Sequence, residues 1–183
     1  VNAAYNQKLD ILETVGITNI KIENKYEIVS SNMFYNRRSQ QIYSNKETTI
    51  KDVNGNIYNL ENSFQFDLNN EIITTDKINI IDTDNNIYIF ENAKINLVSK
   101  EILGKELKID FVDNYFGIPN NDPILKGRSA ISNNEQTKIY KSVFSTCNTT
   151  NKSCPGWEIE TEEFTHDKVN KVFNYKNSWL KLF

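Results

Sequence analysis

The sequence predicts an all-β protein, a twisted β-jellyroll of stacked antiparallel hairpins around an apolar interior. Three observations support this fold class. The 183 residues include 28 Asn and 23 Ile but only four Ala, and Asn and β-branched residues are weak helix formers. Apolar and polar side chains alternate along most of the chain, as in half-buried strands. A unit of two alternating stretches also recurs about every 30 residues, which is typical of repeat architectures.

The repeat is clearest in three segments that align on a tyrosine. They begin at Tyr26, Tyr58 and Tyr88, so that the offsets are 32 and 30 residues. Each segment contains an alternating stretch, a polar turn and a second alternating stretch. Asn and Gly tolerate the positive φ that tight hairpin turns require, so we expect them to supply the turn conformation. The expected turns and connectors lie at 36–39, 53–56, 69–70, 82–86 and 99–100.

Two weaker copies follow, one starting at Gly127 and turning at 133–134, the other starting at Trp157 and turning near His166. Between the strong and weak copies, residues 112–127 hold four of the nine Gly and Pro residues. We expect a long loop there, and long loops often make functional contacts. A single hairpin cannot bury its apolar face alone. We therefore predict ten or more strands in one domain that spans residues 1–183.

Nine apolar side chains are expected on the inner face of the sheet. Two interpretations of them stay open: they fill an ordinary core between two sheets, or the sheets part and the inner face holds an apolar ligand such as acyl chains. The assignment depends on strand register, since a one-residue slip would turn each side chain outward. The expected inner-face residues are Phe64, Phe66, Tyr88, Phe90, Ile95, Leu97, Leu107, Ile109 and Phe111.

Charge and hydropathy exclude several classes of partner. The 21 basic and 24 acidic residues are interspersed and give a net charge of −3, so no basic stripe is available for nucleic acid. The sequence has no apolar run of about 18 residues, the length that a membrane-spanning helix needs. Residues 1–10 lack the pattern of a signal peptide, so any such segment has been removed or was never present.

The sequence offers little catalytic chemistry. His166 is the only imidazole, and we expect it at a solvated turn. The acidic cluster at 82–86 lacks the Gly and the distal Glu of an EF-hand loop, so we interpret it as a turn rather than a calcium site. We therefore predict that the protein is not an enzyme and needs no metal or cofactor.

The two cysteines, Cys147 and Cys154, are seven positions apart. With one histidine in the chain, a four-ligand zinc site is not expected. A disulfide is favoured and would suit an oxidising compartment such as the periplasm. Two free thiols in a cytosolic loop are the alternative.

The C-terminal third resembles the N-terminal periplasmic, OstA-like domain of the LptD family of lipopolysaccharide-assembly proteins. The three tyrosine-anchored hairpins upstream resemble the OstA-type repeat, which LptA and LptC share. The features that carry the resemblance, in chain order, are the LKGR turn at 125–128, the Thr146–Cys147 strand end, the CPGW segment at 154–157, the His166–Asp167 turn and the aromatic strand at 175–183.

The resemblance implies a domain at the periplasmic face of the outer membrane of Gram-negative bacteria. Such a domain accepts lipopolysaccharide from LptA by edge-strand pairing, here through an unpaired strand expected near residues 9–23. It then conducts the acyl chains of lipid A to an outer-membrane barrel, which is absent from this chain and which LptE accompanies in the full protein. In the family, disulfides tie this domain to the barrel. Cys147 matches the family position and Cys154 departs from it, so pairing with each other or with barrel cysteines stays open.

Two other functions stay open. An LptA- or LptC-like bridge protein would have the same repeats without a barrel downstream. A stacked-β polysaccharide-degrading enzyme would need converging carboxylates or a Lys or Arg base on one face. The acidic residues here are scattered over predicted turns, which favours the transport function.

Overall fold

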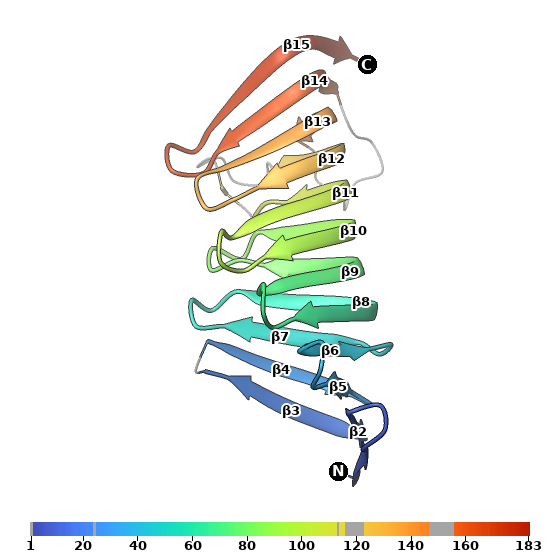
Figure 1. The fold of residues 1–183 in the computed structure, drawn as a ribbon. Helices are drawn as coiled ribbons and strands as arrows, with labels where there is room; N and C mark the ends of the chain where they lie inside the picture. Colours follow the sequence, from blue (N-terminus) through green and yellow to red (C-terminus); the bar gives the residue numbers. More distant parts are fainter. Residues whose placement is uncertain (1, 24, 113, 116–122, 147–155) are drawn as a thin grey trace.

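The computed structural model describes residues 2–23, 25–112, 114–115, 123–146 and 156–183. Within these ranges all regular structure is β, and the strands form one antiparallel sheet of 15 strands (Figure 1). No helix in the described ranges is long and apolar enough to cross a membrane. The strands are β1 (Asn2–Asn6), β2 (Ile11–Val15), β3 (Ile17–Ile22), β4 (Tyr26–Ser31), β5 (Phe34–Asn36), β6 (Gln41–Ser44), β7 (Thr48–Asp52), β8 (Ile57–Asp67), β9 (Ile72–Ile81), β10 (Ile87–Asn96), β11 (Glu101–Asp110), β12 (Pro123–Ser132), β13 (Gln136–Thr146), β14 (Trp157–Asp167) and β15 (Val172–Leu182).

The sheet is a stack in which each long strand pairs with its neighbours in the chain. From β8 to β15 the spatial order equals the sequence order, and Figure 1 shows the strands rising in that order toward the C-terminus. The two end strands of the stack do not pair with each other, so the sheet is not closed into a barrel. The predicted all-β, jellyroll-like fold is confirmed.

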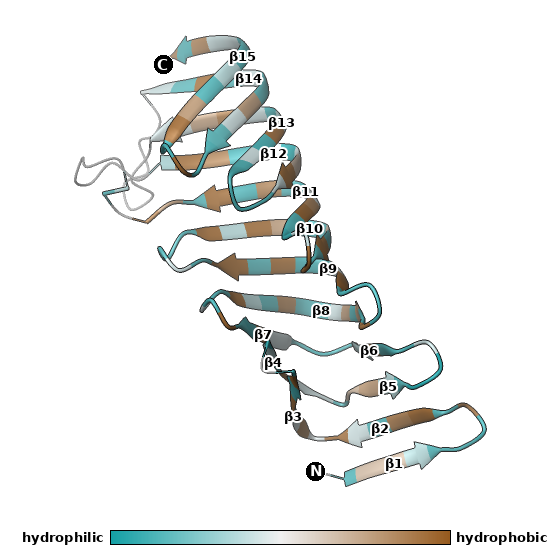
Figure 2. Cartoon of the chain, turned by 60° about the vertical axis from the view of Figure 1, so that its left-hand side comes forward, coloured by the Kyte–Doolittle hydropathy of each residue, from teal (hydrophilic) through white to brown (hydrophobic). Residues whose placement is uncertain are grey.

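The single sheet is folded into two walls. Residues 57–60 of β8 pair with β7, whereas residues 64–67 of the same strand pair with β6. Below β8 the sheet therefore divides into two arms, which Figure 2 shows as separate rows of strands. We call wall A the arm β1-β2-β5-β6 with the halves of β8–β15 that continue it, and wall B the arm β3-β4-β7 with the other halves.

The line along which the walls meet, the corner, is marked by residues with positive φ. Gly16 separates β2 from β3, and Asn32 follows β4 before β5 begins. The Gly16 N–H donates to Asn32 Oδ1, and the Asn32 N–H donates to the Gly16 carbonyl oxygen. Asn62 and Asn92 occupy the same place in β8 and β10, with φ of 72° and 53°. The intervals of 30 residues from Asn32 to Asn62 to Asn92 show that the sequence repeat is also the repeat of the bend.

Buried hydroxyl groups bind the backbone where the strands bend. The hydroxyl of Thr75 donates to the carbonyl oxygen of Ser63 at 2.7 Å, and that of Thr161 to the carbonyl oxygen of Lys176 at 2.8 Å. Both threonines are at most 4% exposed. A buried carbonyl without a hydrogen-bond partner would destabilise the fold. These hydroxyls supply that partner where the bent backbone lies next to the apolar interior.

Five hairpin turns share one design. In each, a side-chain oxygen of Asn or Asp accepts hydrogen bonds from the backbone N–H groups two and three residues later. The residue four positions after that Asn or Asp has positive φ. The prediction that Asn and Gly supply the positive φ is wrong for these turns, because Asp, Gln, Glu or Lys holds it there. The accepting residues are Asn6, Asn36, Asp67, Asn96 and Asp167, and those with positive φ are Asp10, Gln40, Glu71, Lys100 and Lys171.

Two expected boundaries differ in the structure. The loop predicted at 112–127 ends earlier, since β12 begins at Pro123; residues 113 and 116–122 are outside the described ranges. Gly127 lies inside β12, where an added Cβ would come within 2.0 Å of Ile139 Cγ2. Its role is to allow close packing rather than to form a turn. The single unpaired strand expected near residues 9–23 is two strands: β2 pairs on both sides, and within the described ranges β3 pairs only with β4.

Candidate functional site

The nine predicted inner-face residues lie together between the walls. All are buried, with exposed fractions from 0% to 8%, and they belong to β8, β10, β11 and the residues directly after β10 and β11. Phe66 and Phe90 are among the largest fully buried side chains. In this state the side chains of the two walls pack against each other, so the interior is a filled core. Lipid binding by these residues stays a prediction.

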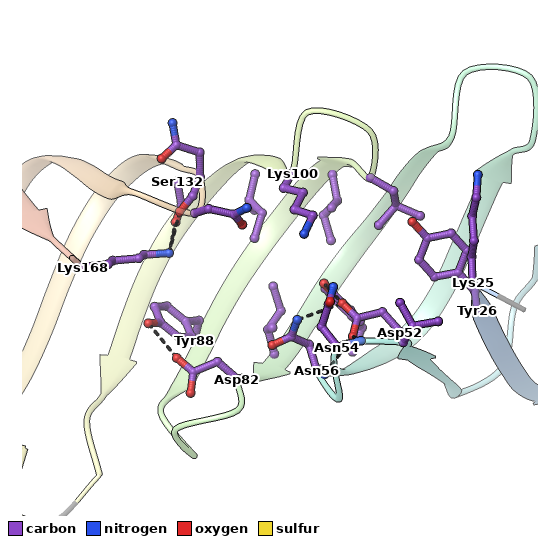
Figure 3. Close-up of a pocket in the computed structure, with 18 residues that line it drawn as sticks. Lys25, Tyr26, Asp52, Asn54, Asn56, Asp82, Tyr88, Lys100, Ser132 and Lys168 are labelled. Carbon is purple, nitrogen blue, oxygen red and sulfur yellow. Dashed lines mark hydrogen bonds between the residues drawn. The ribbon is translucent and has the colours of Figure 1, made fainter.

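A pocket of about 360 Å³ lies at the open side of the fold, opposite the corner (Figure 3). Ile80, Ile95 and Ile102 form an apolar floor that is continuous with the core. We call this open side the mouth. Its rim A consists of the turns of wall A at 68–71, 97–100, 133–135 and 168–171, and its rim B of the connectors of wall B at 53–56 and 82–86, with Lys25.

Rim B is built from two copies of one connector. Asp82 Oδ1 accepts the backbone N–H groups of Asp84 and Asn86 at 3.0 and 2.8 Å, and Asp82 Oδ2 accepts the hydroxyl of Tyr88 at 3.1 Å. Asp52 and Tyr58 repeat this arrangement. Burial, and then the nearby carboxylate, raises the pKa of both tyrosines, so the hydroxyls stay protonated.

The acidic cluster at 82–86 thus serves turn geometry, as predicted. Among the described residues, no group of three or more His, Cys, Asp and Glu could hold a metal ion. The Asp–Tyr pairs themselves were missed at the sequence level. A signal was present, because each Asp precedes its Tyr by six residues in both connectors.

Rim A contributes ammonium groups. Lys168 Nζ donates to the hydroxyl of Ser132 at 3.0 Å and to the carbonyl oxygen of Asn133 at 2.8 Å, and lies 5.3 Å from the centroid of the Tyr88 ring (Figure 3). Burial lowers the pKa of Lys168 to about 8, against the opposing effect of the Asp82 charge. Lys168 therefore links the two rims, and the sequence alone did not single it out.

A second link across the mouth lies nearer the N-terminus. Lys25 Nζ on rim B is 3.1 Å from Glu71 Oε1 on rim A. This ion pair raises the pKa of Lys25. Because the Lys25 side chain is about half exposed, the pair contributes little to stability. The pocket thus lies between two links that join the rims.

His166 is not at a solvated turn, and that prediction is wrong. It lies in β14, is 1% exposed, and packs against the rings of Phe111 and Phe173. Its Nε2 is 3.1 Å from the hydroxyl of Tyr115, which belongs to the segment after β11. Burial first, and then the charge of Lys168, lowers the pKa of His166 to about 4. A signal was again present: His166 follows buried Phe164 by two positions, which places both on the same face of a strand.

The predicted disulfide residues, Cys147 and Cys154, are outside the described residues.

The ends of the stack are open for pairing. In the described part of the chain, β1 pairs only with β2 and β15 only with β14. Both strands are largely exposed, and β15 presents Trp179 and Leu180 to solvent.

Comparison with known proteins does not identify a family or a function for this chain. The sequence matches no protein-family model and no curated protein. The resemblance to the LptD family therefore stays a prediction, and the functional argument depends on the folded sheet, its apolar interior and its open edges.

Proposed function

We propose that this protein is a lipopolysaccharide-conducting domain of the OstA-like type found in the LptD family. The observation that carries the proposal is a single open sheet, folded so that its inner faces form one apolar surface from β3 to β14. Acyl chains between the walls would be shielded from water, at about 0.8 kcal/mol for each buried methylene. No reaction is involved, so the proposed protein is not an enzyme.

Entry of acyl chains requires the walls to separate. The inner side chains are 0–8% exposed, so lipid has to replace contacts between Phe, Ile and Leu side chains by similar contacts with methylenes. Such an exchange is nearly neutral in free energy because both surfaces are apolar. The rims are linked by the Lys25–Glu71 ion pair and by Lys168 over Tyr88. Opening along the mouth has to break these links and, nearer the C-terminus, the contacts of Tyr115 with His166 and Lys171.

The open ends of the stack suit the partners that transport needs. An extended partner strand can add to an exposed sheet edge through backbone hydrogen bonds. The edges of β1 and β3 would accept LptA, and β15 would face the outer-membrane barrel and LptE at the periplasmic face of the outer membrane. Open edges at both ends suit an LptA- or LptC-like bridge equally well, which makes that the second candidate.

The carboxylates at the mouth argue against a polysaccharide-degrading enzyme. Asp52 and Asp82 are the acidic residues of the pocket lining. Each accepts several hydrogen bonds from its own connector and from a tyrosine hydroxyl. A general acid or base needs a free oxygen directed at substrate, and these oxygens hold turns together.

Site-specific photocrosslinking tests the transport function. A photoreactive amino acid replaces Phe66 or Phe90, which point inward, or Gln65 or Glu91, which are exposed neighbours in the same strands. In cells that assemble the full protein, we expect lipopolysaccharide adducts at the two inner positions and background labelling at the outer ones. Equal labelling at inner and outer positions would refute the interior path. Absence of adducts at all four positions, with the protein folded, would refute transport.

A further inference from the structure

The pocket at the mouth combines a polar entrance with an apolar floor. Its floor, Ile80, Ile95 and Ile102, is part of the same core as the nine inner-face residues. Its entrance carries amide, carboxylate, hydroxyl and ammonium groups from both rims. A molecule that complements this pocket has a hydrogen-bonding head and at least one apolar chain directed into the fold.

The amide groups of the pocket suit a ring that carries hydroxyls. A sugar hydroxyl both donates and accepts hydrogen bonds, and an asparagine amide offers a donor and an acceptor together. Asn54 on rim B and Asn134 beside Ser132 on rim A line the pocket from opposite sides. Within the described ranges, neither side-chain amide makes a hydrogen bond, so both are available to a ligand. The Tyr26 and Tyr58 side chains also line the pocket and add flat apolar surface to it.

The ammonium groups of the pocket lie mainly on one side. Lys100 and Lys168 both line the pocket from rim A, from the turns at 97–100 and 168–171, and the turn at 133–135 lies between these two. The Lys100 ammonium group points into the pocket in Figure 3. Among the described residues, Lys100 makes no ion pair, and Lys168 hydrogen-bonds only uncharged oxygens. Lys25 is already paired with Glu71 and Glu23. An anion beside Lys100 and Lys168 would gain charge-assisted hydrogen bonds that neither lysine now has.

The carboxylates lie on the opposite side, on rim B. Asp52 and Asp82 accept hydrogen bonds from their own connectors, which leaves them oriented away from further ligation but still negative. They would repel an anion placed near rim B. The Asp82 charge also reaches Lys168, which lies over the Tyr88 ring. An anionic substituent is therefore best placed at rim A toward Lys100, and neutral hydroxyls suit rim B.

We infer that this pocket seats the head of a glycolipid, a sugar ring whose anionic substituent lies against Lys100 and Lys168 and whose acyl chain crosses the Ile80 floor. The inference rests on the proposed function, in which the cargo is a phosphorylated amino-sugar lipid. In this arrangement the head is held between the two rims while the acyl chains lie between the walls. Binding of the head in this pocket, the head-group site or seat, would fix how deep each acyl chain reaches into the core.

A nuclear magnetic resonance titration tests the seat with a soluble head group. The probe is the deacylated, phosphorylated glucosamine disaccharide, added to the uniformly ¹⁵N-labelled chain. We expect saturable shifts of the side-chain amide signals of Asn54 and Asn134. The signal of Asn69, an exposed amide on a rim A turn outside the pocket lining, should not move. Lys100→Gln should weaken binding by about tenfold or more through loss of one charged hydrogen bond. Lys94→Gln, an exposed lysine of β10 outside the lining, should have no effect.

Three results would overturn the inference. They are no shift at Asn54 and Asn134, an equal shift at Asn69, or the same shifts with inorganic phosphate alone, which would indicate an anion site without sugar recognition. The outcome is separable from that of the transport experiment. Adducts at Phe66 and Phe90 without these shifts would keep transport and remove the seat, whereas shifts without adducts would keep a sugar-phosphate site and remove transport.

Discussion

The imidazole of His166 illustrates how burial decides the charge of one residue. Aromatic rings from β15 and from the segment after β11 surround it, and its Nδ1 has no hydrogen-bond partner among the described residues. Burial, and then the charge of nearby Lys168, lowers its pKa to about 4. In the unfolded chain the pKa is about 6.5, so between pH 6.5 and 4 the unfolded state binds more protons.

We therefore expect acid to destabilise the fold through His166. Stability is complete above pH 6.5 and falls as the pH decreases toward 4, because protonation favours the unfolded state. Between pH 7 and pH 5 the loss should be about 1–2 kcal/mol. Urea unfolding at both pH values measures it. His166→Gln, which does not titrate, should lose less stability over this interval, and an unchanged pH dependence in the variant would show that His166 plays no part.

Inner-face residues could be predicted from sequence, whereas the residues of the mouth could not. Phe64, Phe66 and Phe90 follow from period-two alternation, because a strand whose one face is buried fixes the parity of each apolar side chain. Lys168, in a turn, and Tyr88, in β10, meet across the mouth although they are about 80 residues apart in the sequence. No local pattern encodes such a contact, since it depends on how the two walls fold toward each other.

At the scale of single elements, the five matching turns stabilise the hairpins of wall A. Asn96 is representative: its Oδ1 accepts the N–H groups of Val98 at 2.9 Å and Ser99 at 3.0 Å. Successive turns are also linked, because Leu97 donates its N–H to the carbonyl oxygen of Glu71 in the turn below. The side-chain acceptor thus orients a turn whose backbone carbonyl accepts a hydrogen bond from the next turn.

Replacing the acceptor should weaken the hairpin measurably. Asn96→Ala removes both hydrogen bonds and should cost about 1 kcal/mol, or about 2–4 °C in the midpoint of thermal unfolding. Asn96→Asp keeps the acceptor and should stay near the parent. Ser99→Ala, in the same turn, changes a side chain without a hydrogen bond among the described residues and is the matched control. If the Asn96→Ala and Ser99→Ala variants have the same midpoint of thermal unfolding, the side-chain acceptor does not stabilise the turn.

The bend of each strand was only partly predictable. Asn62 and Asn92 hold positive φ at the corner, and asparagine tolerates that conformation. Glu106 and Lys141 hold positive φ inside β11 and β13, and neither residue type favours it. Their conformation follows from the neighbouring strands, which already bend at that level. A sequence pattern therefore locates some bends, while pairing imposes the rest.

At the scale of the whole molecule, stability should vary along the stack. Each strand from β8 to β14 pairs with neighbours on both sides, as in repeat proteins whose units are stabilised by adjacent units. The central strands β9, β10 and β11 are flanked on both sides. At the ends, β1 is exposed throughout and β15 is mostly exposed. Opening should therefore start at the ends.

Native-state hydrogen exchange measures this gradient. We expect the slowest amides in β9–β11 and the fastest in β1–β3 and β15, with rates that differ by at least about 100-fold. The reason is that a central amide exchanges only when several adjacent strands open together. Uniform protection from β2 to β14 would contradict the gradient and indicate a single cooperative unit.

The regular spacing of the Asn and Asp turns determines the length of the stack of strands. Adjacent strands lie about 4.8 Å apart, so each two-strand unit lengthens the stack by about 10 Å while its cross-section stays the same. The accepting residues at 6, 36, 67 and 96 mark successive units. Duplication of one such unit in the gene would give a longer protein with the same profile and the same end strands. The distance that such a protein can bridge between two fixed partners is therefore set by a count of units, independently of what the interior holds.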